Sequence, residues 1–154
     1  MAYDHLLLQG QEYRALADFR YHIRRFLHFS EEAARGEGLE PQQHQMMLAI
    51  RGLQSAEGPT VGVLAAYLLV RHHSAVGLID RLEKRGFAIR ERQPGDRRHA
   101  IVRLTPAGGA VLERLAGAHR AELASLAPHL VKALETVLTH RGDTKEGNVP
   151  AFRE

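Results

Sequence analysis

Residues 93–106 read QPGDRRHAIVRLTP, and residues 80–86, shortly before them, read DRLEKRG. Pro94-Gly95 suits the central positions of a type II turn, so we expect a hairpin with strands at 87–92 and 99–104. A cationic hairpin tip beside a cationic helix is the arrangement with which a protein reads duplex nucleic acid.

The positive charge of the chain is concentrated around this segment. Residues 70–103 contain nine Lys or Arg and four Asp or Glu, a net charge of +5, whereas the rest of the chain carries twelve basic and fourteen acidic residues. A basic patch on an otherwise near-neutral body is typical of a nucleic-acid-binding protein, because phosphate contacts supply the sequence-independent part of the affinity. A merely solvated basic face would give the same count, so charge alone leaves both interpretations open.

The composition excludes several classes of protein. The chain has 154 residues, 44% of them hydrophobic, which is enough for one domain-sized core. No apolar run approaches the ~20 residues that span a bilayer, and residues 1–10 lack the features of a signal peptide, so we expect a cytoplasmic protein with no membrane partner. The absence of cysteine excludes disulfides, thiolate metal ligands and thiol-based redox sensing.

Apolar periodicity predicts four helices before the hairpin. The first covers about 6–34, and its length of roughly 40 Å exceeds what a small domain needs for its own core, so we expect much of it to pack on a second copy. The next covers 42–55, and a short helix capped by Thr60 extends through Leu69. A three-residue break then leads to a helix over 72–85, which Gly86 ends, and this pair is a candidate helix-turn-helix. The core side chains expected in the last helix are Ala75, Leu78, Ile79 and Leu82.

Helices are also expected after the hairpin. Thr105 and Pro106 form a cap and a first helical position, and Pro128 is expected to separate that helix from a last one. Residues 139–154 are polar and rich in turn formers, which is typical of a loose tail. The chain is therefore predicted to be mainly α with a small β-hairpin wing.

This order of elements resembles the MarR family of bacterial transcription regulators over about residues 6–138. The segments that carry the resemblance are Asp80-Arg81-Leu82-Glu83 followed by Gly86, and Asp96-Arg97-Arg98 followed by Leu104-Thr105. It implies a winged helix-turn-helix fold, with an N-terminal dimerisation helix over 1–38, a DNA-binding lobe over 39–104, C-terminal dimerisation helices over 105–138 and a polar tail over 139–154. It also implies a homodimer, without a cofactor, that represses by binding a pseudo-palindromic operator in double-stranded DNA and that a small-molecule effector releases.

The resemblance places the DNA contacts on the 72–85 helix and on the wing. Many family members carry a polar residue and an arginine where this chain has Val76 and Gly77, which implies fewer direct guanine contacts. In the wing, Arg98 would enter the minor groove, Asp96 would hold its guanidinium, and Arg97 would lie on the phosphate backbone. The expected contacts on and beside the helix are Arg71, His72, His73, Ser74, Val76, Gly77, Arg81, Lys84 and Arg85.

The same resemblance places a ligand pocket between the dimerisation helices and the DNA-binding lobe. Aromatic and methionine side chains at helical spacing are also ordinary core residues, so their place in a pocket stays open. Arg20 and His22, cations beside apolar residues, would suit a phenolic or carboxylate ligand. The expected lining residues are Tyr13, Phe19, Arg20, His22, Phe26, His44 and Met47.

Other functions find little support in the sequence. Ten histidines suggest metal binding, but only Glu40 with His44 and His119 with Glu122 have ligand spacing on one helix face, and neither pair has a second histidine four residues on, so no metal is expected. No motif positions a nucleophile beside a base, so an enzyme is not expected. The remaining alternative is a winged-helix module that docks an acidic protein. A preference for one duplex sequence would distinguish a DNA-binding regulator from such a module.

Overall fold

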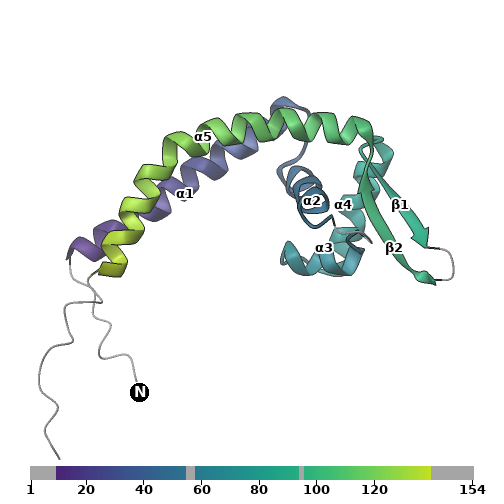
Figure 1. The fold of residues 1–154 in the computed structure, drawn as a ribbon, viewed down its shortest axis with the longest axis horizontal. Helices are drawn as coiled ribbons and strands as arrows, with labels where there is room; N and C mark the ends of the chain where they lie inside the picture. Colours follow the sequence, from purple (N-terminus) through teal and green to yellow (C-terminus); the bar gives the residue numbers. More distant parts are fainter. Residues whose placement is uncertain (1–9, 55–57, 94–95, 140–154) are drawn as a thin grey trace, which may run out of the picture. The chain divides into compact units, whose positions relative to one another are not determined.

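The computed structural model describes residues 10–54, 58–93 and 96–139, and the side chains at 93 and 96–99 are not part of that description. The chain divides into two compact units. The helical pair contains Met1–His28 with Ala121–Glu154, and the central unit contains Phe29–Arg120. The elements, labelled in Figure 1, are α1 (Gly10–Gly36), α2 (Pro41–Gly52), α3 (Val61–Tyr67), α4 (His72–Lys84), β1 (Ala88–Gln93), β2 (Asp96–Leu104) and α5 (Pro106–Thr139). The predicted fold class, mainly α with a β-hairpin, is confirmed.

The central unit has a continuous apolar core. Met46, Met47 and Ile50 of α2 pack with α3 and α4, and all four side chains predicted to face inward from α4 are buried. Ala34 at the end of α1 and Leu112 near the start of α5 belong to the same core. The central unit therefore includes more of the chain than the predicted lobe over 39–104, because the ends of both long helices contribute to its core.

The helix starts follow the predicted capping chemistry. Thr60 precedes α3, and its Oγ1 accepts a hydrogen bond from the Val63 N–H at 3.3 Å. Thr105 precedes α5, where its Oγ1 accepts the Gly108 N–H at 3.1 Å and Pro106 takes the first helical position. Each cap satisfies a backbone donor that a helix start would otherwise leave unpaired.

Three connections in the central unit end a helix in the same way. At each of them one residue has a left-handed φ, of 71° at Gly38, 55° at Leu69 and 71° at Gly86. The N–H of that residue and the N–H of the next one both bond back to the last turn, which is the Schellman arrangement. The short helix expected to run through Leu69 therefore ends at Tyr67, because a left-handed residue cannot continue a right-handed helix.

The hairpin is an antiparallel pair in which Ala88 lies opposite Leu104 and Arg90 lies opposite Val102. The pairing shifts register between Arg92 and Gln93, near the tip. The predicted Pro94-Gly95 turn lies outside the described residues. At the base, the Val102 N–H bonds to the Pro59 carbonyl at 2.9 Å, which anchors β2 to the segment before α3.

The C-terminal region corrects one prediction. Pro128 was expected to separate two helices, but Pro106–Thr139 is one helix with Pro128 inside it. Proline removes one N–H donor, so it leaves the carbonyl of Ala124 without its helical partner. Both residues are exposed, so water can hydrate that carbonyl and the helix continues.

Within the described ranges, no single helix is long and apolar enough to cross a membrane; α3 and α4, bent by 110° relative to each other, meet that requirement as a pair by length and composition alone.

Candidate nucleic-acid interface

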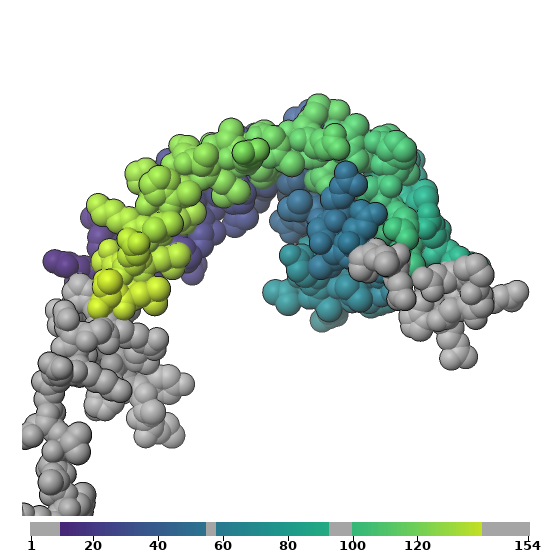
Figure 2. Space-filling view, in the orientation of Figure 1, coloured from purple at the N-terminus to yellow at the C-terminus, as the bar shows by residue number. Residues whose placement is uncertain are grey.

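Helix α4 has one buried face and one exposed face. Ala75, Leu78, Ile79 and Leu82 lie in the core. His72 and His73 in the first turn, and Arg81 and Lys84 in the last turns, are exposed, whereas Ser74, Val76 and Gly77 are partly buried. In Figure 2 the teal surface of α3 and α4 forms one side of the central unit. The predicted contact residues of α4 therefore share the solvent side of one helix.

Arg90 of β1 ties the hairpin to α4. Its guanidinium bonds Asp80 at 2.7 Å, pairs with Glu83, and donates to the Val76 carbonyl at 3.3 Å. The backbone N–H of Arg90 also bonds a Glu83 carboxylate oxygen at 2.7 Å. In the sequence, Arg90 is only one of the nine basic residues between positions 70 and 103. The structure shows that the two acids of α4 neutralise it and fix the orientation of α4 against the hairpin.

Replacing Arg90 with methionine is expected to lower the free energy of unfolding by about 1–3 kcal/mol, because two carboxylates and a carbonyl lose a charged donor whose side chain is only 23% exposed. The matched control is Arg103→Met, which breaks one pair with the half-exposed Glu91 and should cost less than about 1 kcal/mol. Urea unfolding followed by circular dichroism measures both. Equal losses in the two variants would contradict the bridging role.

The other basic residues fall into two groups. Arg85, predicted to contact phosphate, donates to the Gly38 carbonyl at 2.5 Å and lies over the Phe87 ring at 4.7 Å from its centroid. Arg103 is paired with Glu91. Within the described part of the chain, the exposed basic side chains of α4 and β1 and their flanks that make neither an ion pair nor a side-chain hydrogen bond are Arg71, Arg81, Lys84 and Arg92. These four side chains are therefore available to bind an external anion.

The wing residues of the predicted site are placed only by their backbone. Asp96, Arg97 and Arg98 begin β2, at the end of the strand away from its anchored base. Their side chains lie outside the description, so the assignment of Arg98 to a minor groove stays a prediction.

The seven predicted ligand residues are divided between the two units. Tyr13, Phe19, Arg20, His22 and Phe26 belong to the helical pair, while His44 and Met47 belong to the central unit. Tyr13 is 60% exposed, and His44 and Met47 are buried. The pocket predicted between the dimerisation helices and the lobe stays a prediction.

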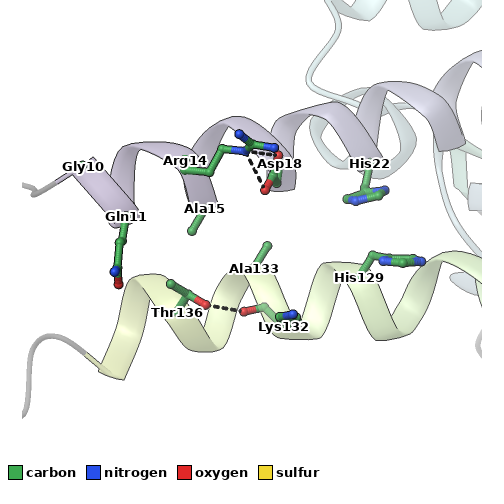
Figure 3. A pocket seen from close by; sticks show the side chains of 10 residues that line it. All are labelled: Gly10, Gln11, Arg14, Ala15, Asp18, His22, His129, Lys132, Ala133 and Thr136. Carbon is green, nitrogen blue, oxygen red and sulfur yellow. Dashed lines mark hydrogen bonds and ion pairs between the residues drawn. The ribbon is translucent and has the colours of Figure 1, made fainter.

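A cavity of about 500 Å³ lies within the helical pair (Figure 3). The rings of His22 and His129 stack at its edge, with centroids 4.9 Å apart and planes 14° from parallel, and the buried Nδ1 of His22 makes no hydrogen bond among the described residues. Arg14 is paired with Asp18 at 3.2 Å, and Lys132 also lines the cavity. Of the residues that line this cavity, only His22 was expected to bind a ligand. The α5 residues were missed because the sequence does not reveal which turn of α5 lies beside His22.

A second histidine pair lies in the central unit. The ring of His44 on α2 is 4.8 Å from the ring of His119 on α5. Nδ1 of His119 donates to the Leu115 carbonyl at 2.6 Å, and Nε2 lies 2.7 Å from the Ser30 hydroxyl. Within the described ranges, no three histidine or carboxylate side chains come together as metal ligands.

Burial lowers the pKa of His44 to about 4 from an ordinary value of 6.5, and the charge of His119 adds to this effect. Between these two values the unfolded chain binds a proton that the folded chain does not, so stability falls as the pH falls. We expect the free energy of unfolding to drop by about 2 kcal/mol more in the parent than in His44→Leu between pH 7.5 and pH 5. Thermal melts at both pH values measure this, with the exposed His72→Gln as control. A parallel pH response of parent and His44→Leu would contradict it.

The comparison with known families agrees with this geometry. The family model described as MarR family matches residues 37–99, which contain α2, α3, α4, β1 and the beginning of β2. This match supports the resemblance of the chain to the MarR family. The order of elements and the winged helix-turn-helix predicted from the sequence are those of this family.

Individual relatives support the same assignment. The transcriptional activatory protein BadR of Rhodopseudomonas palustris is 38% identical over 84 residues, which are 54% of this chain and 48% of BadR, so this chain spans about half the length of that relative. The S. aureus MepR-DNA complex has a TM-score of 0.66 at 17% identity and covers 80% of this chain and 92% of that one. CouR from Rhodococcus jostii RHA1, bound to p-coumaroyl-CoA, has a TM-score of 0.57 at 21% identity and covers 73% and 83%. At these identities the two solved structures show a shared fold.

Proposed function

We propose that this protein is a transcription regulator that binds double-stranded DNA in a sequence-specific way. The observation that carries the proposal is the division of charge around α4. Asp80 and Glu83 are occupied by Arg90, whereas Arg71, Arg81, Lys84 and Arg92 are exposed and unpaired among the described residues. This surface therefore presents cations to phosphate without competing carboxylates. MepR, which has the same fold, is solved with DNA, and BadR is named a transcriptional protein.

In this proposal α4 enters the major groove. His73, with donor and acceptor nitrogens, faces base edges, while Arg71 and Lys84 at the two ends of α4 contact phosphates on either side. The hairpin follows the backbone so that Arg98 reaches the minor groove, where a planar guanidinium is favoured. The hydrogen bonds and ion pairs of Arg90 would keep α4 and the hairpin in a fixed orientation relative to each other.

The proposed active form is a homodimer. The helical pair leaves large apolar side chains exposed, which an isolated two-helix unit cannot bury. A second copy packed on this surface would place two α4 helices in successive major grooves, so the operator would be an inverted repeat. The side chains concerned are Tyr13, Tyr21, Val131, Leu134 and Leu138.

We also propose that the protein represses transcription and is released by a phenolic or carboxylate effector. The cavity in the helical pair supports this chemistry, because the stacked rings of His22 and His129 offer a flat surface and Lys132 offers a cation. CouR shows that the fold accommodates an aromatic acyl compound. A ligand acts by binding better to a dimer with mis-spaced α4 helices. BadR is named an activatory protein, so a reporter assay should be able to detect both repression and activation of transcription.

Selection of bound duplexes from a random library at near-physiological salt tests the function. We expect an inverted repeat with half-site centres about ten base pairs apart. Recovery of no motif, together with binding that vanishes as salt rises, would leave only non-specific electrostatics and would favour a module that docks an acidic protein.

A further inference from the structure

The three helix ends of the central unit that share a left-handed residue differ in one respect. Two of them place glycine there, Gly38 and Gly86, as the geometry favours. The third, between α3 and α4, places Leu69 there. Its backbone bonds are the same as those of the other two: the Leu69 N–H bonds to Ala66 at 3.2 Å and the Val70 N–H to Ala65 at 3.0 Å. The fold therefore needs a left-handed residue at this position, and nothing in the backbone bonding requires a leucine.

The leucine stabilises nothing inside the chain. A residue with a side chain is strained in the left-handed region relative to the right-handed one, because Cβ crowds the following carbonyl oxygen. The side chain of Leu69 is 93% exposed, the highest value among the exposed large hydrophobic residues of the described chain. Backbone strain without internal packing is characteristic of a residue that acts on something outside the chain.

The position of Leu69 indicates its partner. It lies two residues before Arg71, the N-cap of α4, and is followed by the exposed His72 and His73. If α4 enters the major groove, its first turn and the residues just before it come closest to the base edges. The apolar group that a leucine can meet there is the 5-methyl group of thymine.

We propose that Leu69 is a specificity residue that packs on a thymine methyl group in each half-site. This inference rests on the proposed function. Removing one buried methyl group weakens binding about four-fold, so its removal from both half-sites should weaken it about fifteen-fold. The chain would thereby read a base pair by apolar contact, which suits a helix that has Val76 and Gly77 on its reading side.

The test uses the full-length protein and the duplex recovered by selection. Each thymine is replaced in turn, symmetrically in both half-sites, by deoxyuridine, which lacks only the methyl group. We expect one position at which the parent loses about fifteen-fold in affinity. At the same position Leu69→Ala, which keeps the backbone strain but not the isobutyl group, should lose less than about two-fold. Leu48→Ala, which truncates an exposed leucine on α2, should behave as the parent does.

The glycine variant separates binding from folding. Leu69→Gly relieves the strain, so its melting temperature should equal or exceed that of the parent while its operator binding falls as in Leu69→Ala. A lower melting temperature would show that the leucine serves the fold, and would overturn the inference. If replacing thymine by deoxyuridine lowers the affinity of the parent and of Leu69→Ala equally at every position, the inference is also overturned. Absence of any selected sequence would instead count against the proposed function.

Discussion

Replacing Gly108 with alanine is expected to destabilise the protein by about 3 kcal/mol or more, the largest effect of any single methyl addition that we predict. A Cβ at Gly108 would lie 2.1 Å from the carbonyl oxygen of Phe87 and 2.9 Å from its carbonyl carbon. That carbonyl is fixed, because it accepts the Thr105 N–H at 3.0 Å. The added Cβ would clash with backbone atoms of Phe87 and not with a flexible side chain, so the first turn of α5 would have to move away from the base of the hairpin.

The matched control is the next residue. A Cβ at Gly109 meets nothing within 4 Å, and an alanine there should stabilise the helix by about 0.5–1 kcal/mol. Urea unfolding of both variants gives the comparison. A Gly108→Ala variant as stable as Gly109→Ala would show that α5 does not start against Phe87 as described.

Arg98→Ala is expected to weaken operator binding by about 1–3 kcal/mol and to reduce its salt dependence slightly, with no loss of folding. The physical reason is the negative potential of a narrow minor groove, which favours a planar cation. Arg98→Lys keeps the charge without the planar group and should recover only part of the loss. Fluorescence anisotropy with a labelled operator at several salt concentrations measures all three proteins. Unchanged affinity in Arg98→Ala would contradict the assignment of the wing.

Local chemistry made much of the fold predictable. The burial of Ala75, Leu78, Ile79 and Leu82 follows from their helical spacing, and the caps at Thr60 and Thr105 follow from hydroxyls placed just before apolar stretches. The prediction at Pro128 was wrong for a local reason. A proline indicates a helix break most strongly where the freed carbonyl is buried, and the sequence does not show that Ala124 is exposed.

The candidate site was less predictable because it depends on which distant groups meet. The exposed cations of α4 could be expected from its amphipathic pattern. The bridge from Arg90 to Asp80 and Glu83 joins a strand to a helix, and the bond from Arg85 to Gly38 joins residues 47 apart in sequence, so neither leaves a local signal. The left-handed Leu69 was missed because leucine is a good helix former, and the tertiary turn overrides that propensity.

The most direct test of the central claim compares two affinities. The dissociation constant of the full-length protein is measured at near-physiological salt for the selected duplex and for a scrambled duplex of the same length and composition. Sequence-specific reading by α4 predicts that the selected duplex binds about a thousand-fold more tightly, or better. Equal affinities for the two duplexes would mean that the protein meets DNA only through its charge, and would contradict the account.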